Sequence, residues 1–171
     1  MNQTHFLTQV DPKTPILMSV LEPKAAGTAV SDWREKNLVV RTVRGRKMRR
    51  VDDLFDEMAA ALQFPNYFGE NWPAFDECLS DMDWLTPKAG LVVAVFEPDM
   101  VLRDSTDADM ATFVRTIVHA AEVYAEPIEL GEWWDRPPVP FHVFLLSAPA
   151  ESAGALSRWE GAGAVIAHLN V

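Results

Sequence analysis

Two apolar runs constrain the fold of this chain more than any other feature. Gly90–Phe96, GLVVAVF, is apolar on both faces of an extended strand, and residues 141–146, FHVFLL, are nearly as apolar. Strands of this kind have to be covered on both sides, which is typical of the centre of a parallel sheet. Both runs are far shorter than the roughly 20 residues that span a membrane as a helix. The runs therefore predict a layered α/β protein.

The segments between the predicted strands have the periodicity of helices. In Val51–Leu62, apolar residues recur at intervals of three and four, which indicates an amphipathic helix. A second, short helix is expected to begin at Asn71, a favoured N-cap residue, with Pro73 tolerated in its first turn. A third helix is expected over residues 106–124, which carry one apolar stripe.

With a strand at residues 38–43, these elements follow the order β-α-α-β-α-β. Helical connections between successive strands predict a small parallel three-stranded sheet with right-handed crossovers, packed by helices. Residues 15–21 and 164–169 are candidates for extra edge strands, one from each end of the chain.

Length and composition suit one globular domain. The 171 residues are 49% hydrophobic and 23% charged, which is ordinary for a soluble protein. We expect a single domain over residues 1–171, with its core at about 38–147 and extensions at 1–37 and 148–171. The N-terminus lacks the pattern of a secretion signal, and a single cysteine, Cys78, forms no internal disulfide. These features predict a cytoplasmic protein with no membrane partner.

Charge is unevenly distributed along the chain. The formal net charge is −10, and residues 52–109 hold 14 Asp and Glu against two Lys and Arg. Such a field repels nucleic acid and attracts basic proteins, although an acidic surface can also serve solubility alone. The basic run RTVRGRKMRR at residues 41–50 raises nucleic-acid contact as an alternative. We interpret it as a strand and turn whose arginines offset nearby acids, and we expect no nucleic-acid partner.

The segment FPNYFGENWPAFDECL, residues 64–79, sets aromatic side chains directly before a cluster of carboxylates. If Asn71 caps the second helix, polar residues three and four apart share its outer face. These residues are Asp76, Glu77 and Ser80, with Asp81 and Asp83 just beyond. The preceding loop holds two aromatic residues, Tyr67 and Phe68. Aromatics give contact area at little entropic cost and acids pair with Arg or Lys, so this surface suits a basic protein partner.

The aromatic residues have a second interpretation, in which they close the core beneath the loop. We favour it for Trp72 and Phe75, whereas Tyr67 and Phe68 lie in a turn and stay open between core and contact. Cys78 is interpreted as a buried apolar residue on the inner face of the helix.

The stretch FPNYFGENWPAFDECLSDMDW resembles the signature of the barstar family, whose members inhibit ribonucleases inside the cell. The order of the predicted helices and strands is also similar to that family over residues 38–147. The resemblance implies a barstar-like fold. It also implies that the loop and second helix plug a ribonuclease active site, with carboxylates in place of RNA phosphates.

The resemblance assigns roles by position. Glu77 stands at the family's central acidic position, Asp76 stands beside it, and Trp84 lies near the family's aromatic at the helix end. The family usually has Asp where this chain has Pro73, so one carboxylate is missing, and Glu122 is the candidate for an acidic contact from the long helix. The contacting loop would contain Tyr67, Gly69, Asn71 and Trp72. The full set of predicted partner-binding residues is Tyr67, Phe68, Gly69, Asn71, Trp72, Asp76, Glu77, Ser80, Asp81 and Trp84.

The predicted function is therefore inhibition of a basic ribonuclease or ribonuclease-like toxin by an immunity protein that is monomeric when free. No cofactor, metal or catalytic residue is expected. One alternative is a barstar-like module for another basic protein, which the missing acid at Pro73 favours. Another is an enzyme that holds Mg²⁺ or Ca²⁺ through the acids of residues 76–83, but their spacing fits no ligand template, and the histidines form no metal motif.

Two further features complete the predictions from sequence. His142 lies within an apolar strand and is interpreted as a core residue. Trp133 and Trp134 lie in a loop flanked by prolines and stay open between core and contact.

Overall fold

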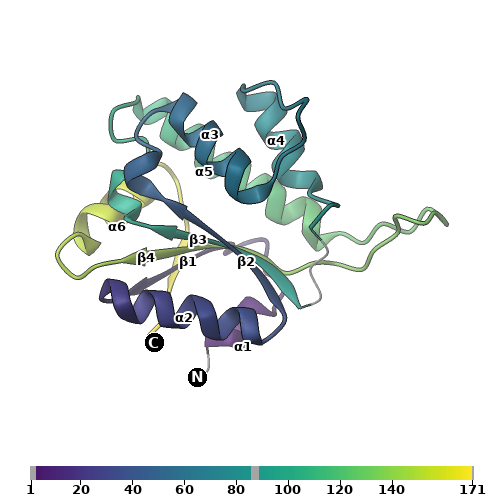
Figure 1. Cartoon of the computed structure of the whole chain (residues 1–171), viewed down its shortest axis with the longest axis horizontal. Coiled ribbons are helices and arrows are strands. Elements are labelled where there is room, and N and C mark those ends of the chain that lie inside the picture. Colours follow the sequence, from purple (N-terminus) through teal and green to yellow (C-terminus); the bar gives the residue numbers. More distant parts are fainter. Residues whose placement is uncertain (1–2, 86–88, 171) are drawn as a thin grey trace.

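A computed structural model describes residues 3–85 and 89–170. Within these residues, the centre of the molecule is a parallel sheet in the order β2-β3-β4-β1-β5 (Figure 1). Its strands are β1 (Ile16–Val20), β2 (Leu38–Arg44), β3 (Gly90–Phe96), β4 (Phe141–Ser147) and β5 (Ile166–His168).

The two central strands are buried along almost their whole length. Every residue of β4 is buried, and in β3 only Phe96 at the end is partly exposed. His142 in β4 is also buried, and its Nε2 donates to the carbonyl oxygen of Gln9 at 2.9 Å. Burial lowers the pKa of His142, which favours the neutral ring. The interpretation of His142 as a core residue is confirmed.

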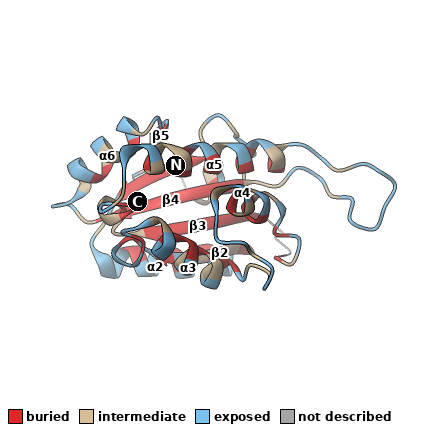
Figure 2. Cartoon of the chain, turned by 90° about the horizontal axis from the view of Figure 1, so that it is seen from above, coloured by how far each residue is buried: buried red, intermediate tan, exposed pale blue. Residues whose placement is uncertain are grey.

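Helices cover both faces of the sheet, and their exposed sides face outward (Figures 1 and 2). One face carries the short α1 (Gln3–Leu7) and α2 (Pro23–Glu35). The other carries α3 (Val51–Leu62), α4 (Trp72–Asp81), α5 (Asp107–Ala125) and α6 (Ser152–Gly161). Two 3-10 turns, η1 (Gly45–Lys47) and η2 (Pro98–Met100), follow β2 and β3. None of the helices in the described residues combines the length and apolar character that a bilayer crossing needs.

The predicted strands are all present, within one residue of their expected ends. Strands also form within residues 15–21 and 164–169, and β5 lies at the edge of the sheet as expected. β1 does not: it pairs with both β4 and β5, so the expectation of an edge position is wrong for it. Its side chains explain the internal position, because Ile16 and Met18 join the core on one face and Leu17 joins the core on the other.

The three predicted helices are confirmed, whereas α2 and α6 were not expected from the sequence. The inner face of each combines alanines with one tryptophan, such as Trp33 in α2, whose ring centroid lies 4.7 Å from that of Phe144. Alanine lets a helix approach the sheet closely, but among Ala, Gly and Ser it gives only a weak apolar period. For this reason the helical period of these two segments could not be recognised in the sequence.

Trp159 ties α6 to the core. Its side chain is fully buried, its Nε1 donates to the carbonyl of Pro98 at 3.0 Å, and its ring centroid lies 5.8 Å from that of Phe113.

Trp159→Ala is expected to lower the free energy of unfolding by about 3–5 kcal/mol, because it opens a cavity in the core. Urea unfolding measures the change. The exposed neighbouring residue serves as control. Glu160→Ala is expected to change the free energy of unfolding by less than about 0.5 kcal/mol. Similar effects of the two variants would contradict an integral role for α6.

Candidate functional site

The chain enters α4 through a turn that is fixed by Asn71. Its Oδ1 accepts a hydrogen bond from the Ala74 N–H at 2.9 Å, and its Nδ2 donates to the Gly69 carbonyl at 3.0 Å. The predicted N-cap is therefore confirmed. Glu70 adopts a left-handed conformation with a φ of 49°, and a Cβ on Gly69 would come within 3.1 Å of the Asn71 Nδ2. The turn is thus tightly specified by its residues.

Beneath this turn lies a cluster of aromatic rings. Phe75 is fully buried, and its ring centroid lies 5.5 Å from that of Phe55 and 5.9 Å from those of Phe64 and Trp72. Phe68 and Trp72 are partly buried and pack on Phe55 at 5.7 and 5.1 Å. The core interpretation is confirmed for Phe75, while Trp72 keeps part of its surface exposed. These rings hold the turn and α4 against α3.

The outer side of this region carries one exposed phenol and three exposed carboxylates. We name this surface the acidic face, and its residues are Tyr67, Glu77, Asp81 and Asp83. Tyr67 is 76% exposed. Partial desolvation and the nearby Cys78, Asp81, Glu77 and Asp83 raise the pKa of its phenol. Partial desolvation and the like charges of Asp83 and Glu77 also raise the pKa of Asp81. The four side chains therefore lie close enough to act on one another.

Asp76 does not join the acidic face. It is partly buried, and its Oδ1 lies 2.8 Å from Nδ1 of His119 on α5. The Asp76 side chain stays 37% exposed beside Glu77, but α5 packs against α4 and brings His119 to its carboxylate, so Asp76 differs from Glu77 in having a partner within the protein. Within the described residues, no Lys, Arg or His forms an ion pair with Glu77, Asp81 or Asp83.

The remaining predicted contact residues differ in exposure. Gly69 and Asn71 are exposed. Trp84 is partly buried, and its Nε1 donates to the Leu62 carbonyl at 2.8 Å. The Oγ atom of Ser80 is buried without a hydrogen-bond partner in the described residues, so this hydroxyl does not reach the surface as the outer-face prediction required. The close packing of α4 explains the difference. Cys78 is buried as expected.

Arg136 lies beside the acidic face, although no sequence pattern singles it out. Its guanidinium carbon is 5.3 Å from the ring centroid of Tyr124, and its positive charge opposes the rise in the pKa of Asp81. The Tyr124 hydroxyl donates to the Leu79 carbonyl at 3.0 Å. This bond joins the end of α5 to α4. Together, the two contacts link Leu79 on α4, Tyr124 on α5 and Arg136 in the loop after α5. No local sequence pattern predicts an arrangement of three separate segments.

The basic run at residues 41–50 is used within the protein. Arg44 pairs with Glu57, Arg46 with Glu97 and Arg49 with Asp104, each at 2.8 Å. The interpretation that these arginines offset nearby acids is confirmed.

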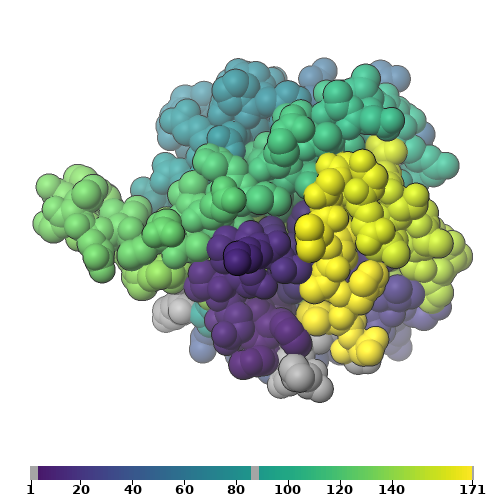
Figure 3. All heavy atoms as spheres, turned by 180° about the vertical axis from the view of Figure 1, so that it is seen from behind, coloured from purple at the N-terminus to yellow at the C-terminus, as the bar shows by residue number. Residues whose placement is uncertain are grey.

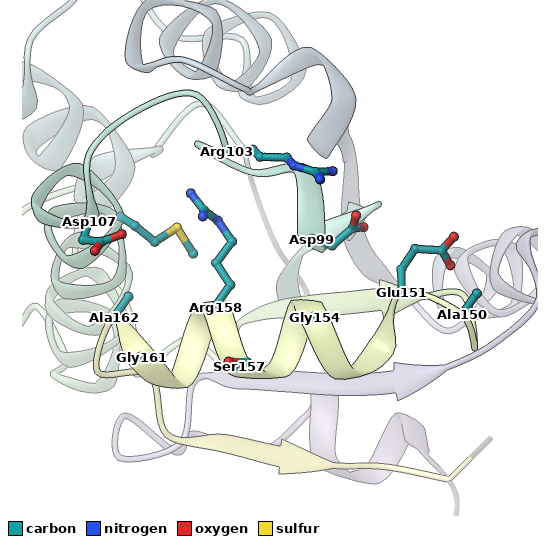
Figure 4. Close-up of a pocket in the computed structure, with 11 residues that line it drawn as sticks. Asp99, Arg103, Asp107, Ala150, Glu151, Gly154, Ser157, Arg158, Gly161 and Ala162 are labelled. Atoms are coloured by element: carbon teal, nitrogen blue, oxygen red, sulfur yellow. The ribbon is translucent and has the colours of Figure 1, made fainter.

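Two hollows lie away from the acidic face. One, of about 510 Å³, lies between η2, the start of α5, and α6. Asp99, Arg103 and Asp107 surround it (Figure 4). Arg158, at its side, donates to the carbonyl oxygens of Val101 and Leu102 and so holds the adjoining loop. The other, of about 830 Å³, lies at the carboxyl ends of β1–β4, with an apolar floor and a rim of mixed charge. Neither concentrates charge of one sign.

The acids of α4 do not converge. Among residues 3–85 and 89–170, no three His, Cys, Asp or Glu side chains gather as a bound metal ion would require. This arrangement gives no support to the alternative of a divalent-metal site at residues 76–83.

Comparison with protein families gives one match in sequence. A family described as Barstar (barnase inhibitor) matches residues 38–146, which is more than half of the chain and contains the whole acidic face. No curated protein matches the chain in sequence.

Comparison with solved structures gives matches of low identity. The ORC2 protein of Aeropyrum pernix, in ADPNP–ADP complexes, matches with a TM-score of 0.53 and 12% identity over 91% of this chain and 41% of its own. Cdc6p from Pyrobaculum aerophilum matches with a TM-score of 0.52 and 12% identity over 96% of this chain and 41% of its own. A chain of the Drosophila ORC bound to AT-rich DNA and Cdc6 has a TM-score of 0.49 and 14% identity, over 97% and 50% of the two chains. The chain thus spans half or less of the length of these proteins. At 12% identity, the first two matches show a similar fold and nothing about function.

Partial desolvation and neighbouring like charges make Asp81 a source of pH dependence. Because its pKa is raised in the folded protein, its contribution to stability is complete below the unfolded pKa of about 4 and is lost as pH rises through the folded pKa. Asp81→Asn cannot ionise, so it is expected to raise the free energy of unfolding at pH 7. The difference in free energy of unfolding between this variant and the unmodified chain should shrink towards zero as pH falls to about 4. Urea unfolding across this range measures it. Asp81→Glu keeps the charge and serves as control; a gain at pH 7 in both variants would contradict the explanation.

Proposed function

The chain belongs to the barstar family of barnase inhibitors, and from this premise we propose that it inhibits a basic ribonuclease or ribonuclease-like toxin as an immunity protein. The acidic face enters the cationic cleft of the enzyme, where its carboxylates take the place of RNA phosphates. The observation that carries the proposal is the grouping of Tyr67, Glu77, Asp81 and Asp83 on one exposed surface inside the matched region.

A rigid base makes this surface suitable for tight binding. The Asn71 cap and the rings packed on Phe75 hold the turn and helix before a partner arrives. Little backbone entropy of the loop is then lost on association. The carboxylates have no ion-pair partner among the described residues, so their charge stays available to Arg, Lys and His of another protein.

Two departures bear on the identity of the target. Pro73 stands where the family usually has Asp, and Asp76 is paired with His119. The first removes a carboxylate from α4, and the second leaves the Asp76 carboxylate in contact with a neighbouring side chain. A target whose cleft is shaped differently from that of barnase fits this surface, and a basic protein that is not a ribonuclease is the second candidate.

Nucleotide binding deserves comparison because the ORC2 structure of similar fold is an ADPNP–ADP complex. In this chain the turn from β1 to α2 contains only Leu21 and Glu22, and α2 begins at Pro23. A phosphate-binding loop needs glycines and several free backbone N–H groups at this position. We therefore do not extend nucleotide binding to this chain.

Neutralising the acidic face tests the proposal. The double variant Glu77→Gln, Asp81→Asn is expected to weaken inhibition of RNA hydrolysis by roughly 2–5 kcal/mol of binding free energy, a scale for which barnase–barstar is itself the standard example. Barnase and other small basic ribonucleases serve as probes, beginning with any that a neighbouring reading frame encodes.

The matched control removes the same charge elsewhere. The double variant Asp32→Asn, Glu160→Gln changes one exposed acid on α2 and one on α6. It is expected to weaken binding to the ribonuclease by less than about 1 kcal/mol. Equal effects of the two pairs would show that net charge, and not the acidic face, determines inhibition.

Ionic strength provides an independent measurement. Electrostatic steering raises association rates from about 10⁵–10⁶ towards 10⁸–10⁹ M⁻¹s⁻¹ at low salt. The association rate of the unmodified chain with an inhibited ribonuclease is therefore expected to fall steeply with added salt, and that of the Glu77→Gln, Asp81→Asn variant to fall less. Stopped-flow mixing measures both slopes, and parallel slopes would contradict a steering role for these two acids.

A further inference from the structure

A long arm projects from the body of the protein between α5 and β4. It comprises residues 126–140, and it extends away from the helices and sheet in each of three views (Figures 1, 2 and 3). Segments that extend from a compact body in this way have little contact with the core, so their shape depends on their own bonds.

The arm is held by bonds within itself. Ile128 and Arg136 exchange two backbone hydrogen bonds, at 2.8 and 3.0 Å. The Asp135 carboxylate accepts from the N–H groups of Leu130 at 3.0 Å and Gly131 at 2.8 Å. These bonds lower the pKa of Asp135. Gly131 has a φ of +79°, which closes the turn at low cost.

The base of the arm is fastened to α5. The Arg136 side chain donates to the carbonyl oxygens of Glu126 at 3.0 Å and Val123 at 3.2 Å, and its guanidinium lies over the Tyr124 ring. The direction in which the arm leaves the body is thus fixed at its root.

The tip of the arm exposes large apolar side chains. Leu130 is 72%, Trp133 is 86% and Trp134 is 44% exposed, and the two indole rings meet edge to face with centroids 5.3 Å apart. Water contact of this much apolar surface is unfavourable by about 25 cal/mol per Å². Exposed tryptophans on a braced loop have the composition of a binding hot spot.

The arm and the acidic face adjoin. Arg136 at the root lies over the Tyr124 ring, and the Tyr124 hydroxyl donates to the carbonyl of Leu79 on α4, two residues before Asp81. The arm is itself acidic, with exposed Glu126 at its base and exposed Glu129 and Glu132 near the apolar tip. A partner that the acidic face attracts is therefore also attracted to the arm.

From these observations we propose that the arm is a second contact element for the same basic protein that the acidic face binds. Leu130, Trp133 and Trp134 occupy an apolar depression beside the cationic cleft of that protein, and Glu129 and Glu132 meet basic side chains around it. The inference rests on the proposed function. A second copy of this chain is a poorer occupant, because its net charge of −10 would face the acids of the arm.

The test replaces the apolar tip and keeps every charge. The probe is whichever of barnase and the other small basic ribonucleases the unmodified chain inhibits most strongly. Trp133→Ser, Trp134→Ser is expected to raise the dissociation constant about tenfold or more, through faster dissociation. The salt dependence of association should stay unchanged. The control Val20→Ser, Val165→Ser alters two exposed apolar side chains outside the arm and should change affinity less than about twofold. Equal urea midpoints show that the arm variant is folded.

The outcomes separate the two proposals. If the arm variant binds as tightly as the unmodified chain while Glu77→Gln, Asp81→Asn binds weakly, the arm proposal is overturned and the proposed function stands. If no ribonuclease of the panel binds, both are overturned. If sedimentation shows the unmodified chain self-associating and the arm variant monomeric, the tip serves a second copy and the arm proposal is wrong. Indole N–H resonances of Trp133 and Trp134 that shift on adding the probe support it directly.

Discussion

The apolar side chains of β3 and β4 point to both faces of the sheet, and all of them have to be shielded from water. This requirement explains why the segments outside the matched family region are part of the same structure. α2 covers one face, with Trp33 against Phe144 of β4. On the other face α6 contributes Trp159, which packs on Phe113 of α5. Without these two helices, large parts of the central strands would lose their cover.

The same layer organisation positions the acidic face. The helices α3, α4 and α5 share one side of the sheet. The inner surface of α4 is buried there through Phe75, which packs against neighbouring rings, and through Cys78 and Leu79. What remains outside is a helix surface with carboxylates and a turn with one exposed phenol. Partial desolvation, together with the like charges gathered there, raises the pKa of Asp81, which means that ionisation of this group opposes folding. A surface that is unfavourable alone and favourable against a cationic partner is typical of a binding site.

Local signals predicted much of this structure from sequence. The period of Val51–Leu62, the Asn71 cap and the two apolar runs each depend on residues near one another, and all are confirmed. The failures depend on distant contacts. The place of β1 inside the sheet is set by pairing with β4, more than a hundred residues away. The contact of Asp76 with His119 was missed because His119 reaches it from α5. Trp133 and Trp134 were left open between core and contact for a different reason: the turn that exposes them is closed by local bonds of Asp135, which no apolar period reveals.

Charge and apolar contact contribute differently to recognition. Carboxylates attract any basic cleft and speed association, so alone they distinguish poorly among basic proteins. If the arm binds as we propose, Trp133 and Trp134 add affinity only where a partner offers an apolar depression of matching shape, and they penalise a partner that presents a polar or charged surface there. α4 carries one carboxylate fewer than its family pattern implies, since Pro73 stands where the family usually has an acid, and the Asp76 carboxylate contacts His119. A chain with a weakened charge match gains most from a second, shape-dependent contact, and the arm lies beside the acidic face where such a contact can act on the same partner.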